Sequence, residues 1–209
     1  MPLFRIRILI VITIFPMVAC TTMGKIAYGY KDLERLDVRT EAHWKKRISR
    51  QKVQMIGTLD SSYMVEMMNL SRNKQFLKAM GQFIVVMAYD SNQCMSISSN
   101  CYFGGFPNLN WKNGTFDSFP FRSAIKDSIC RRLKLPLLLK QSNLKYDSIN
   151  YIKNYIVVLS GNTLIRQTRG LIKTLNKAYP QVNIIVLNND NALYYLFNRL
   201  PLVETCGLN

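Results

Sequence analysis

The last third of the chain carries the pattern that most constrains the fold, an alternation of apolar runs with one helical stretch. Residues 155–159 and 182–187 are short, uncharged and rich in valine and isoleucine, which is typical of buried strands. Residues 164–178 between them repeat leucine and isoleucine at helical spacing, and Pro180 ends the repeat. This order predicts a β-α-β unit with parallel strands and a right-handed crossover.

Other segments predict further helices and one more strand. We expect a helix over residues 31–55, and a methionine-rich helix over residues 62–80 whose methionines belong to the core rather than to a binding surface. The apolar run at 82–89 predicts a strand buried on both faces. A last helix is expected to begin with Asp190 or Asn191 as its cap.

The middle of the chain is rich in turn signals. Residues 90–121 contain Gly-Gly, Asn-Gly and two prolines among aromatic residues, which favours a loop or small hairpins. Those aromatics suit packing, which we favour, or stacking on sugar rings or bases. From Ser123 to about Leu135 we predict a basic amphipathic helix that Pro136 ends. With 48% apolar and 19% charged residues the chain is not of disordered type, so we expect one α+β domain over residues 31–209.

The N-terminus has the features of a secretory signal. Arg5 and Arg7 precede an uncharged run of 12 residues, 8–19. A membrane-spanning helix needs roughly 20 apolar residues, so this run is too short to be one. A basic start, a short apolar run and a small residue before a cleavage site together predict a signal peptide over residues 1–19.

The sequence at the predicted cleavage site is more specific. Met17-Val18-Ala19-Cys20 resembles a lipobox, the signal of bacterial lipoproteins. The resemblance implies that Cys20 is lipidated and becomes the first mature residue, with residues 20–30 as a tether. Thr21 follows the cysteine where an aspartate would imply retention in the inner membrane, so the resemblance favours the outer membrane. A plain signal peptide is the alternative.

Four further cysteines suit an oxidising compartment. With Cys20 assigned to lipid, Cys94, Cys101, Cys130 and Cys206 are enough for two disulfides. One of three possible pairings joins Cys94 to Cys101 and Cys130 to Cys206, and four buried free thiols are the alternative. No C-x-x-C motif occurs and the chain has a single histidine, so no metal site is expected.

The chain is strongly basic, with 28 Lys+Arg against 12 Asp+Glu and a formal net charge of +16. Residues 1–19 hold only two of these cations and no acid, so the excess belongs to the mature part. In a cytosolic chain this would suggest nucleic acid, but behind a signal peptide anionic lipid, lipopolysaccharide or an acidic protein is favoured. Solvated helix faces are the alternative. The candidate anion-binding or partner-binding residues are Lys45, Lys46, Arg47, Arg50, Arg166, Arg169, Lys173 and Lys177.

Residues 155–191 also carry a second resemblance. Tyr179-Pro180 closes a helix, a strand follows, and Asp190-Asn191 comes after the strand, which resembles part of the OmpA-like peptidoglycan-binding domain. The resemblance implies that Asp190 contacts the diaminopimelate of the cell wall. The Gly-His-Thr that precedes this aspartate in the family is replaced by Leu187-Asn188-Asn189, so the implied site would be degenerate.

No motif for catalysis stands out. G-x-S-x-G, P-loop and G-x-G-x-x-G patterns do not occur, and no carboxylate pair recurs at a suggestive spacing. We therefore expect a non-enzymatic protein without a cofactor and without catalytic residues. The expected role is that of an outer-membrane lipoprotein facing the periplasm, a structural or accessory component of an envelope assembly of the secretion or conjugation type. A peptidoglycan-binding module is the alternative, and a nucleic-acid-binding protein is less favoured.

Overall fold

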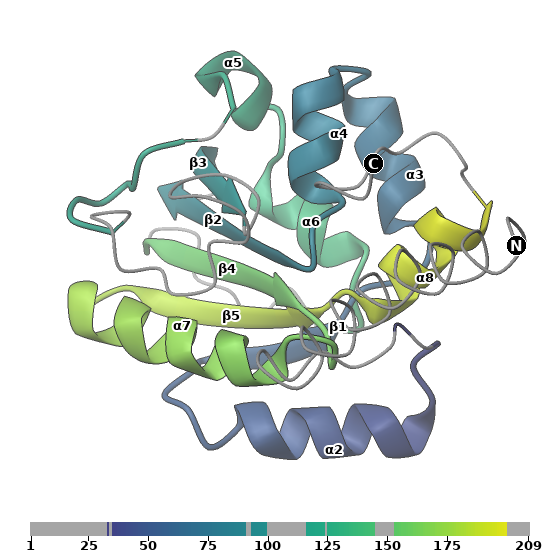
Figure 1. Ribbon diagram of the computed structural model, residues 1–209. Coiled ribbons are helices and arrows are strands. Elements are labelled where there is room, and N and C mark those ends of the chain that lie inside the picture. The colour runs from purple at the N-terminus through teal and green to yellow at the C-terminus, as the bar shows by residue number, and fades with distance from the viewer. Residues whose placement is uncertain are drawn as a thin grey trace, which may run out of the picture. The chain divides into compact units, whose positions relative to one another are not determined.

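In the computed structural model the described residues are 33, 35–90, 93–99, 116–123, 125–144 and 153–199. They contain a mixed sheet of five strands in the order β1-β5-β4-β2-β3, and Figure 1 shows this sheet between two layers of helices. The strands are β1 (Met55–Thr58), β2 (Ile84–Asp90), β3 (Gln93–Ser99), β4 (Tyr155–Ser160) and β5 (Asn183–Asn188). Strands β1, β5 and β4 are parallel, whereas β2 runs antiparallel to β4 and β3 antiparallel to β2. The chain therefore forms a single small α+β domain.

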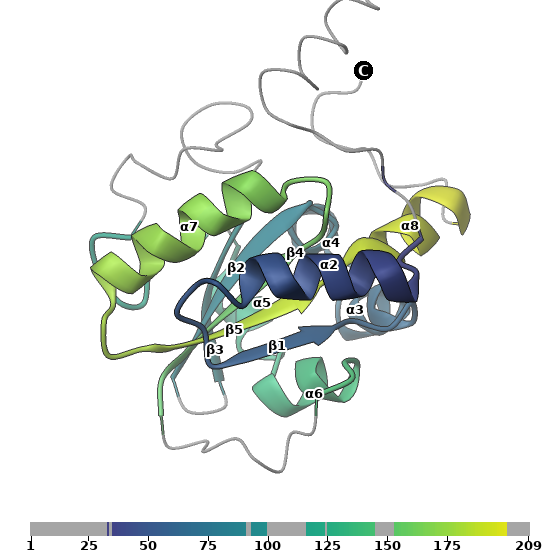
Figure 2. The same cartoon turned by 90° about the horizontal axis from the view of Figure 1, so that it is seen from below.

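Each face of the sheet is covered by its own helices. Figures 1 and 2 show α2 (Val38–Ile48) and α7 (Ile165–Ala178) on one face. The opposite face carries α3 (Tyr63–Leu70), α4 (Lys74–Met80) and α6 (Leu135–Lys140), with the short α5 (Asp127–Cys130) beside β3 and α8 (Asp190–Arg199) after β5. Because helices cover both faces, β2 and β4 are buried along almost their whole length, which explains their continuous apolar sequences.

The predicted β-α-β unit is confirmed. Strands β4 and β5 pair in parallel, with Val158 opposite Val186, and α7 connects them. The apolar positions of α7, including Leu171, Ile172 and Leu175, are buried against the sheet. The strand predicted at 82–89 is β2.

The methionine-rich segment is two helices rather than one. Ser71 adopts an extended backbone after α3, and the side chain of Asn73 then caps α4 by accepting a hydrogen bond from the N–H of Phe76 at 3.1 Å. Met64 and Met67 are fully buried, which confirms that they belong to the core, whereas Met68 is 37% exposed.

The predicted helix from Ser123 to Leu135 is wrong. That stretch contains only the four-residue α5, and a second helix, α6, begins at Leu135. Pro136 lies in the first turn of α6, where the missing N–H of proline is not needed by the helix. The proline therefore begins a helix instead of ending one.

Cys94 on β3 forms a disulfide with Cys130 at the end of α5, with their Cα atoms 5.5 Å apart. A disulfide was expected, but the pairing of Cys94 with Cys101 and of Cys130 with Cys206 is wrong. Residues 94–99 are extended along β3, and α5 packs beside this strand, which brings Cys130 rather than a cysteine nearby in sequence to Cys94. Cys101 and Cys206 lie outside the described residues, as do the signal peptide, Cys20 and the tether.

Within the described residues, no helix is long and apolar enough to cross a membrane. The same part of the chain has no cluster of three or more His, Cys, Asp or Glu side chains arranged to hold a metal ion.

Candidate binding surfaces

The two clusters of cations predicted from the sequence lie on one layer of the domain. The side chain of Asn176 on α7 donates a hydrogen bond to the backbone carbonyl of Lys52, just after α2, at 2.9 Å. This bond brings the last turn of α7 beside the segment that follows α2. We call the combined set the basic surface; it consists of Lys45, Lys46, Arg47, Arg50, Lys52, Arg166, Arg169, Lys173 and Lys177.

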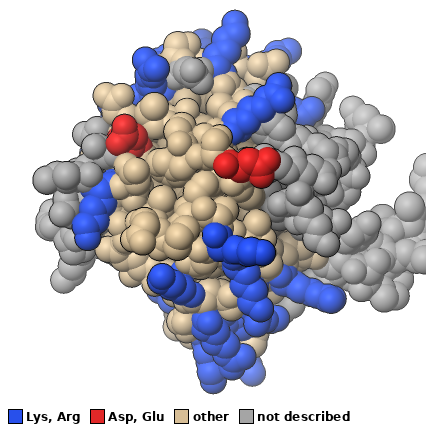
Figure 3. Space-filling view, turned by 90° about the vertical axis from the view of Figure 1, so that its left-hand side faces the viewer, with Lys and Arg blue, Asp and Glu red and all other residues tan. Residues whose placement is uncertain are grey.

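Most of the basic surface is open to solvent. On α7, Arg166, Lys173 and Lys177 are exposed and Arg169 is half-buried, on the side opposite the buried positions. This confirms the helical stripe predicted from spacings of three and four residues. Figure 3 shows lysines and arginines gathered at the lower end of one face of the molecule, with no acid among them in that view.

One predicted cation is already paired. The Nζ of Lys45 lies 2.6 Å from Oε1 of Glu41, one helical turn away, and this ion pair is the first cause that lowers the pKa of Glu41 below its usual value. Lys45 is therefore less available to a partner than Lys46 or Arg50, both of which are exposed.

Asp190 does not face solvent. Its side chain is only 3% exposed at the start of α8. Its Oδ2 accepts hydrogen bonds from the N–H of Asn162 at 2.8 Å and from Nδ2 of Asn188 at 3.2 Å, so the carboxylate holds the β4–α7 loop instead of capping its own helix. Burial raises the pKa of Asp190, and the hydrogen bonds oppose that rise only in part. Contact between Asp190 and peptidoglycan stays a prediction, and the burial of its carboxylate does not favour it.

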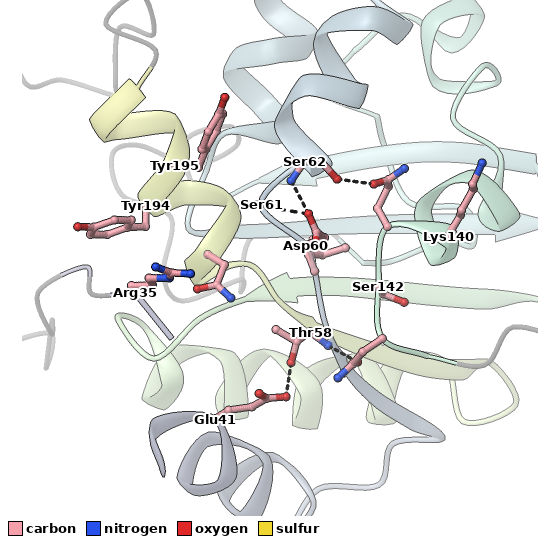
Figure 4. Close-up of a pocket in the computed structure, with 14 residues that line it drawn as sticks. Arg35, Glu41, Thr58, Asp60, Ser61, Ser62, Lys140, Ser142, Tyr194 and Tyr195 are labelled. Atoms are coloured by element: carbon pink, nitrogen blue, oxygen red, sulfur yellow. Dashed lines mark hydrogen bonds between the residues drawn. The ribbon is translucent and has the colours of Figure 1, made fainter. Parts of the chain in front are cut away.

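A different site, which the sequence analysis did not single out, opens beside the carboxyl ends of β1 and β5. It is a pocket of about 960 Å³. Figure 4 shows Asp60 near its middle, with Arg35 on one side, Lys140 on the other, and Tyr194 and Tyr195 at the α8 side. Ligands of open α/β sheets characteristically bind outside the carboxyl ends of parallel strands.

Four stretches that are distant in sequence line the pocket, and one of them contributes Arg35 and Glu41. The end of β1 and the loop after it contribute residues 58–62, the end of α6 and the chain after it contribute residues 140–143, and α8 contributes Asn191 and the two tyrosines. Hydrogen bonds join them: the N–H of Asp60 donates to the carbonyl of Gln141 at 2.7 Å, and the N–H of Leu59 donates to the carbonyl of Asn188 at 2.8 Å.

Side chains also hold the wall in place. The Oδ1 of Asn143 accepts a hydrogen bond from the N–H of Thr58 at 2.9 Å, and the hydroxyl of Thr58 donates to Glu41 at 2.7 Å. The Oδ1 of Asp60 accepts hydrogen bonds from the hydroxyl of Ser61 and from the N–H of Ser62. The bond from the N–H of Ser62 is the main cause that lowers the pKa of Asp60. Asp60 is thus a carboxylate at neutral pH, able to accept hydrogen bonds but not to donate them.

The only signal for this pocket in the sequence is a local one. Asp60 and two serines directly follow a short apolar segment, but the sequence around them does not predict that Lys140 and Asn191 lie close to them in space. Those residues meet because β5 lies directly beside β1 in the sheet.

Comparisons with known proteins found no matching family model, no matching curated protein and no matching solved structure.

Proposed function

We propose that this chain is an exported lipoprotein of the bacterial outer membrane that faces the periplasm and docks onto an acidic protein of an envelope assembly. The observation that carries the proposal is the basic surface, which joins cations from α2 and α7 on one layer of the domain. Its role is that of an accessory or structural component, without catalysis.

Two features support the compartment. Residues 1–20 combine a signal peptide with a sequence that resembles a lipobox. The second feature is the disulfide between Cys94 and Cys130, since structural disulfides persist in exported proteins and are rare in the cytosol.

The charge distribution suits a docking surface. Helix α7 bears four cations and no acid, and no Asp or Glu occurs between Ser148 and Asn189. A surface of one sign attracts a partner of the opposite sign, which accelerates the encounter and excludes wrong partners, and both effects weaken as salt is added.

The lipid anchor is tested by labelling cells with a palmitate analogue. Wild-type protein is expected to incorporate the label and Cys20→Ala is not. Equal incorporation in both would overturn the anchor and, with it, the assignment to the outer membrane.

Docking is tested by reversing charge on α7. Lys173→Glu with Lys177→Glu changes two exposed cations one helical turn apart, and Lys74→Glu with Lys78→Glu on α4 is the matched control on the opposite face of the sheet. When envelopes are gently solubilised and their complexes are separated by size, the wild type and the control are expected to migrate in a large complex. The α7 variant is expected to be absent from that complex. Loss from the complex in both variants, or in neither, contradicts docking through the basic surface.

The same variants separate a protein partner from a lipid surface. Protein without its lipid is mixed with vesicles of phosphatidylglycerol and with vesicles of neutral phosphatidylcholine. An acidic protein partner predicts little sedimentation with either kind. Strong sedimentation with phosphatidylglycerol that the α7 variant abolishes would show that the basic surface binds lipid headgroups instead.

A further inference from the structure

The pocket beside β1 and β5 differs in charge from the rest of the molecule. The whole chain has a formal net charge of +16, yet the pocket is lined by two cations, Arg35 and Lys140, and by two acids, Asp60 and Glu41, of which Glu41 is also paired with Lys45. An anionic ligand would meet the carboxylate of Asp60 near the middle of the pocket. A cationic ligand would meet Arg35 and Lys140 at its sides. The lining therefore favours a ligand without net charge.

The lining also excludes an apolar ligand. Apart from Leu59 and the two tyrosines, every lining residue has a charged, amide or hydroxyl side chain. An apolar molecule in this pocket would remove water from these groups without replacing its hydrogen bonds, which is unfavourable. The ligand must instead be rich in polar atoms.

Hydroxyl groups match the chemistry of the lining. Asp60 can only accept hydrogen bonds, Arg35 and Lys140 can only donate them, and the amides of Gln141 and Asn191 do both. A hydroxyl donates and accepts at once, so a molecule bearing several hydroxyls can satisfy all of these groups. Tyr194 and Tyr195 line the pocket on the α8 side, and their rings extend away from Asp60 in Figure 4.

The pocket is held in shape before any ligand binds. The N–H of Leu36, next to Arg35, donates to Oδ1 of Asn191 at 2.9 Å, and the hydroxyl of Ser62 donates to Oε1 of Gln141 at 2.8 Å. Together with the backbone hydrogen bond from the N–H of Asp60 to the carbonyl of Gln141, these contacts fix the pocket wall. Prior ordering lowers the entropy lost on binding, and the volume of about 960 Å³ is within the range of small-molecule sites.

From these observations we infer that the pocket between the β1–α3 loop, the chain after α6 and α8 binds a neutral saccharide. Asp60 accepts hydrogen bonds from the sugar hydroxyls, and Arg35 donates hydrogen bonds to them. This site is separate from the basic surface and does not depend on the proposed docking role.

The test measures binding of defined sugars to the full-length protein in detergent. Maltose, lactose and chitobiose are titrated by calorimetry, with inorganic phosphate and glutamate as charged competitors for the same pocket. At least one of the three sugars is expected to bind, with no heat from phosphate or glutamate. No binding of any of the three, or tighter binding of phosphate or glutamate, would overturn the inference.

Two pairs of variants locate the site. Asp60→Asn is compared with Asp90→Asn at the exposed end of β2, and Arg35→Gln with Arg39→Gln on the exposed side of α2. Loss of a hydrogen bond to a charged group is expected to weaken the affinity for the sugar approximately tenfold in Asp60→Asn and in Arg35→Gln. The affinity of the two control variants is expected to stay unchanged. Asp60 also holds the turn before α3, so Arg35→Gln, whose side chain has no such role, keeps the test decisive if Asp60→Asn does not fold. Unchanged affinity in Arg35→Gln would place the sugar elsewhere.

Discussion

At the residue scale, the loops after β4 and β5 depend on a contact between a glycine and a buried acid. A Cβ built on Gly161 would run into the carboxylate of Asp190, which is itself held by the N–H of Asn162. Ser160 adds a side-chain bond to Thr168 on α7. In the sequence, Ser160-Gly161-Asn162 indicates only that a strand ends. The need for glycine comes from a residue 29 positions later in the chain, which no local pattern contains.

This contact predicts a difference between two glycines. Gly161→Ala is expected to destabilise the domain by about 1–3 kcal/mol, because the added methyl group forces the buried carboxylate of Asp190 to move. Gly170→Ala is the control, since a Cβ there meets nothing within 4 Å in the middle of α7, and it is expected to stabilise by about 1 kcal/mol. Urea unfolding of both variants measures the two free energies of unfolding. A Gly161→Ala variant as stable as wild type would contradict the close contact.

Asp190 gives a second prediction at this scale, on pH. Its pKa is raised by burial, so the folded protein binds this proton more tightly than the unfolded chain, where the value is near 3.8. The resulting stability is fully present below pH 3.8 and is lost as the pH rises through the folded pKa. Wild type is therefore expected to gain stability relative to Asp190→Asn as the pH falls from about 7 to about 4.

The comparison of the two chains isolates this carboxyl. All other acids are shared, so their titration cancels in the difference between the two free energies of unfolding, measured in urea at each pH. A difference that does not change with pH, or one that moves the other way, would show that the pKa of Asp190 is not raised.

At the scale of elements, the sequence predicted those whose signal lies within their own residues. The strands β2, β4 and β5 have nearly continuous apolar sequences because they are buried between helices on both faces of the sheet. Helix α7 has a clear helical pattern because one of its sides is buried and the other is exposed. The elements around α5 and α6 were missed, since Pro136 is compatible with either end of a helix and only the packing of Leu138 and Leu139 into the core decides between them. The break between α3 and α4 was missed for a similar reason, because Asn73 acts as a cap only once the chain has turned.

Helix α2 shows how a charged segment becomes part of the fold. It has few apolar residues, and its attachment depends on Trp44 and Ile48, which are both fully buried. Trp44→Ala is expected to destabilise the domain by about 3–5 kcal/mol, as truncation of buried large side chains does. Val38→Ala in the same helix is the control, since Val38 is 85% exposed and its truncation is expected to change stability by less than about 0.5 kcal/mol. Urea unfolding followed by far-UV circular dichroism measures both, and similar stabilities for the two variants would contradict the anchoring role of Trp44.

At the scale of the whole molecule, the candidate surfaces were predictable to different degrees. The stripe of cations on α7 follows from helical spacing alone, so the sequence contained it. The cations of α7 form one surface with those of α2 because both helices cover the same face of the sheet, as Figure 2 shows. The sequence alone does not predict this arrangement. The pocket depends on a strand order in which β5 separates β1 from β4, and strand order is a property of the whole chain.

The disulfide is the strongest link between distant parts of the domain. It joins β3, at the edge of the sheet, to α5, across a sequence separation of 36 residues, and both cysteines are fully buried. Closing a loop of this length removes conformational freedom from the unfolded chain, which is worth about 4 kcal/mol in the loop-entropy description. Replacing both residues by alanine is therefore expected to lower the free energy of unfolding by about that amount, measured in urea without reductant.

Reductant provides the matching control, because it acts only on a chain that has the bond. Unfolding the wild type in the presence of dithiothreitol is expected to move its midpoint toward that of the double variant measured in the same reductant. Since both sulfur atoms are buried, the folded wild type is expected to resist reduction until it unfolds. Rapid reaction of Cys94 or Cys130 with a thiol reagent in the folded exported protein would show that the bond does not form, and would remove the disulfide as an argument for an oxidising compartment.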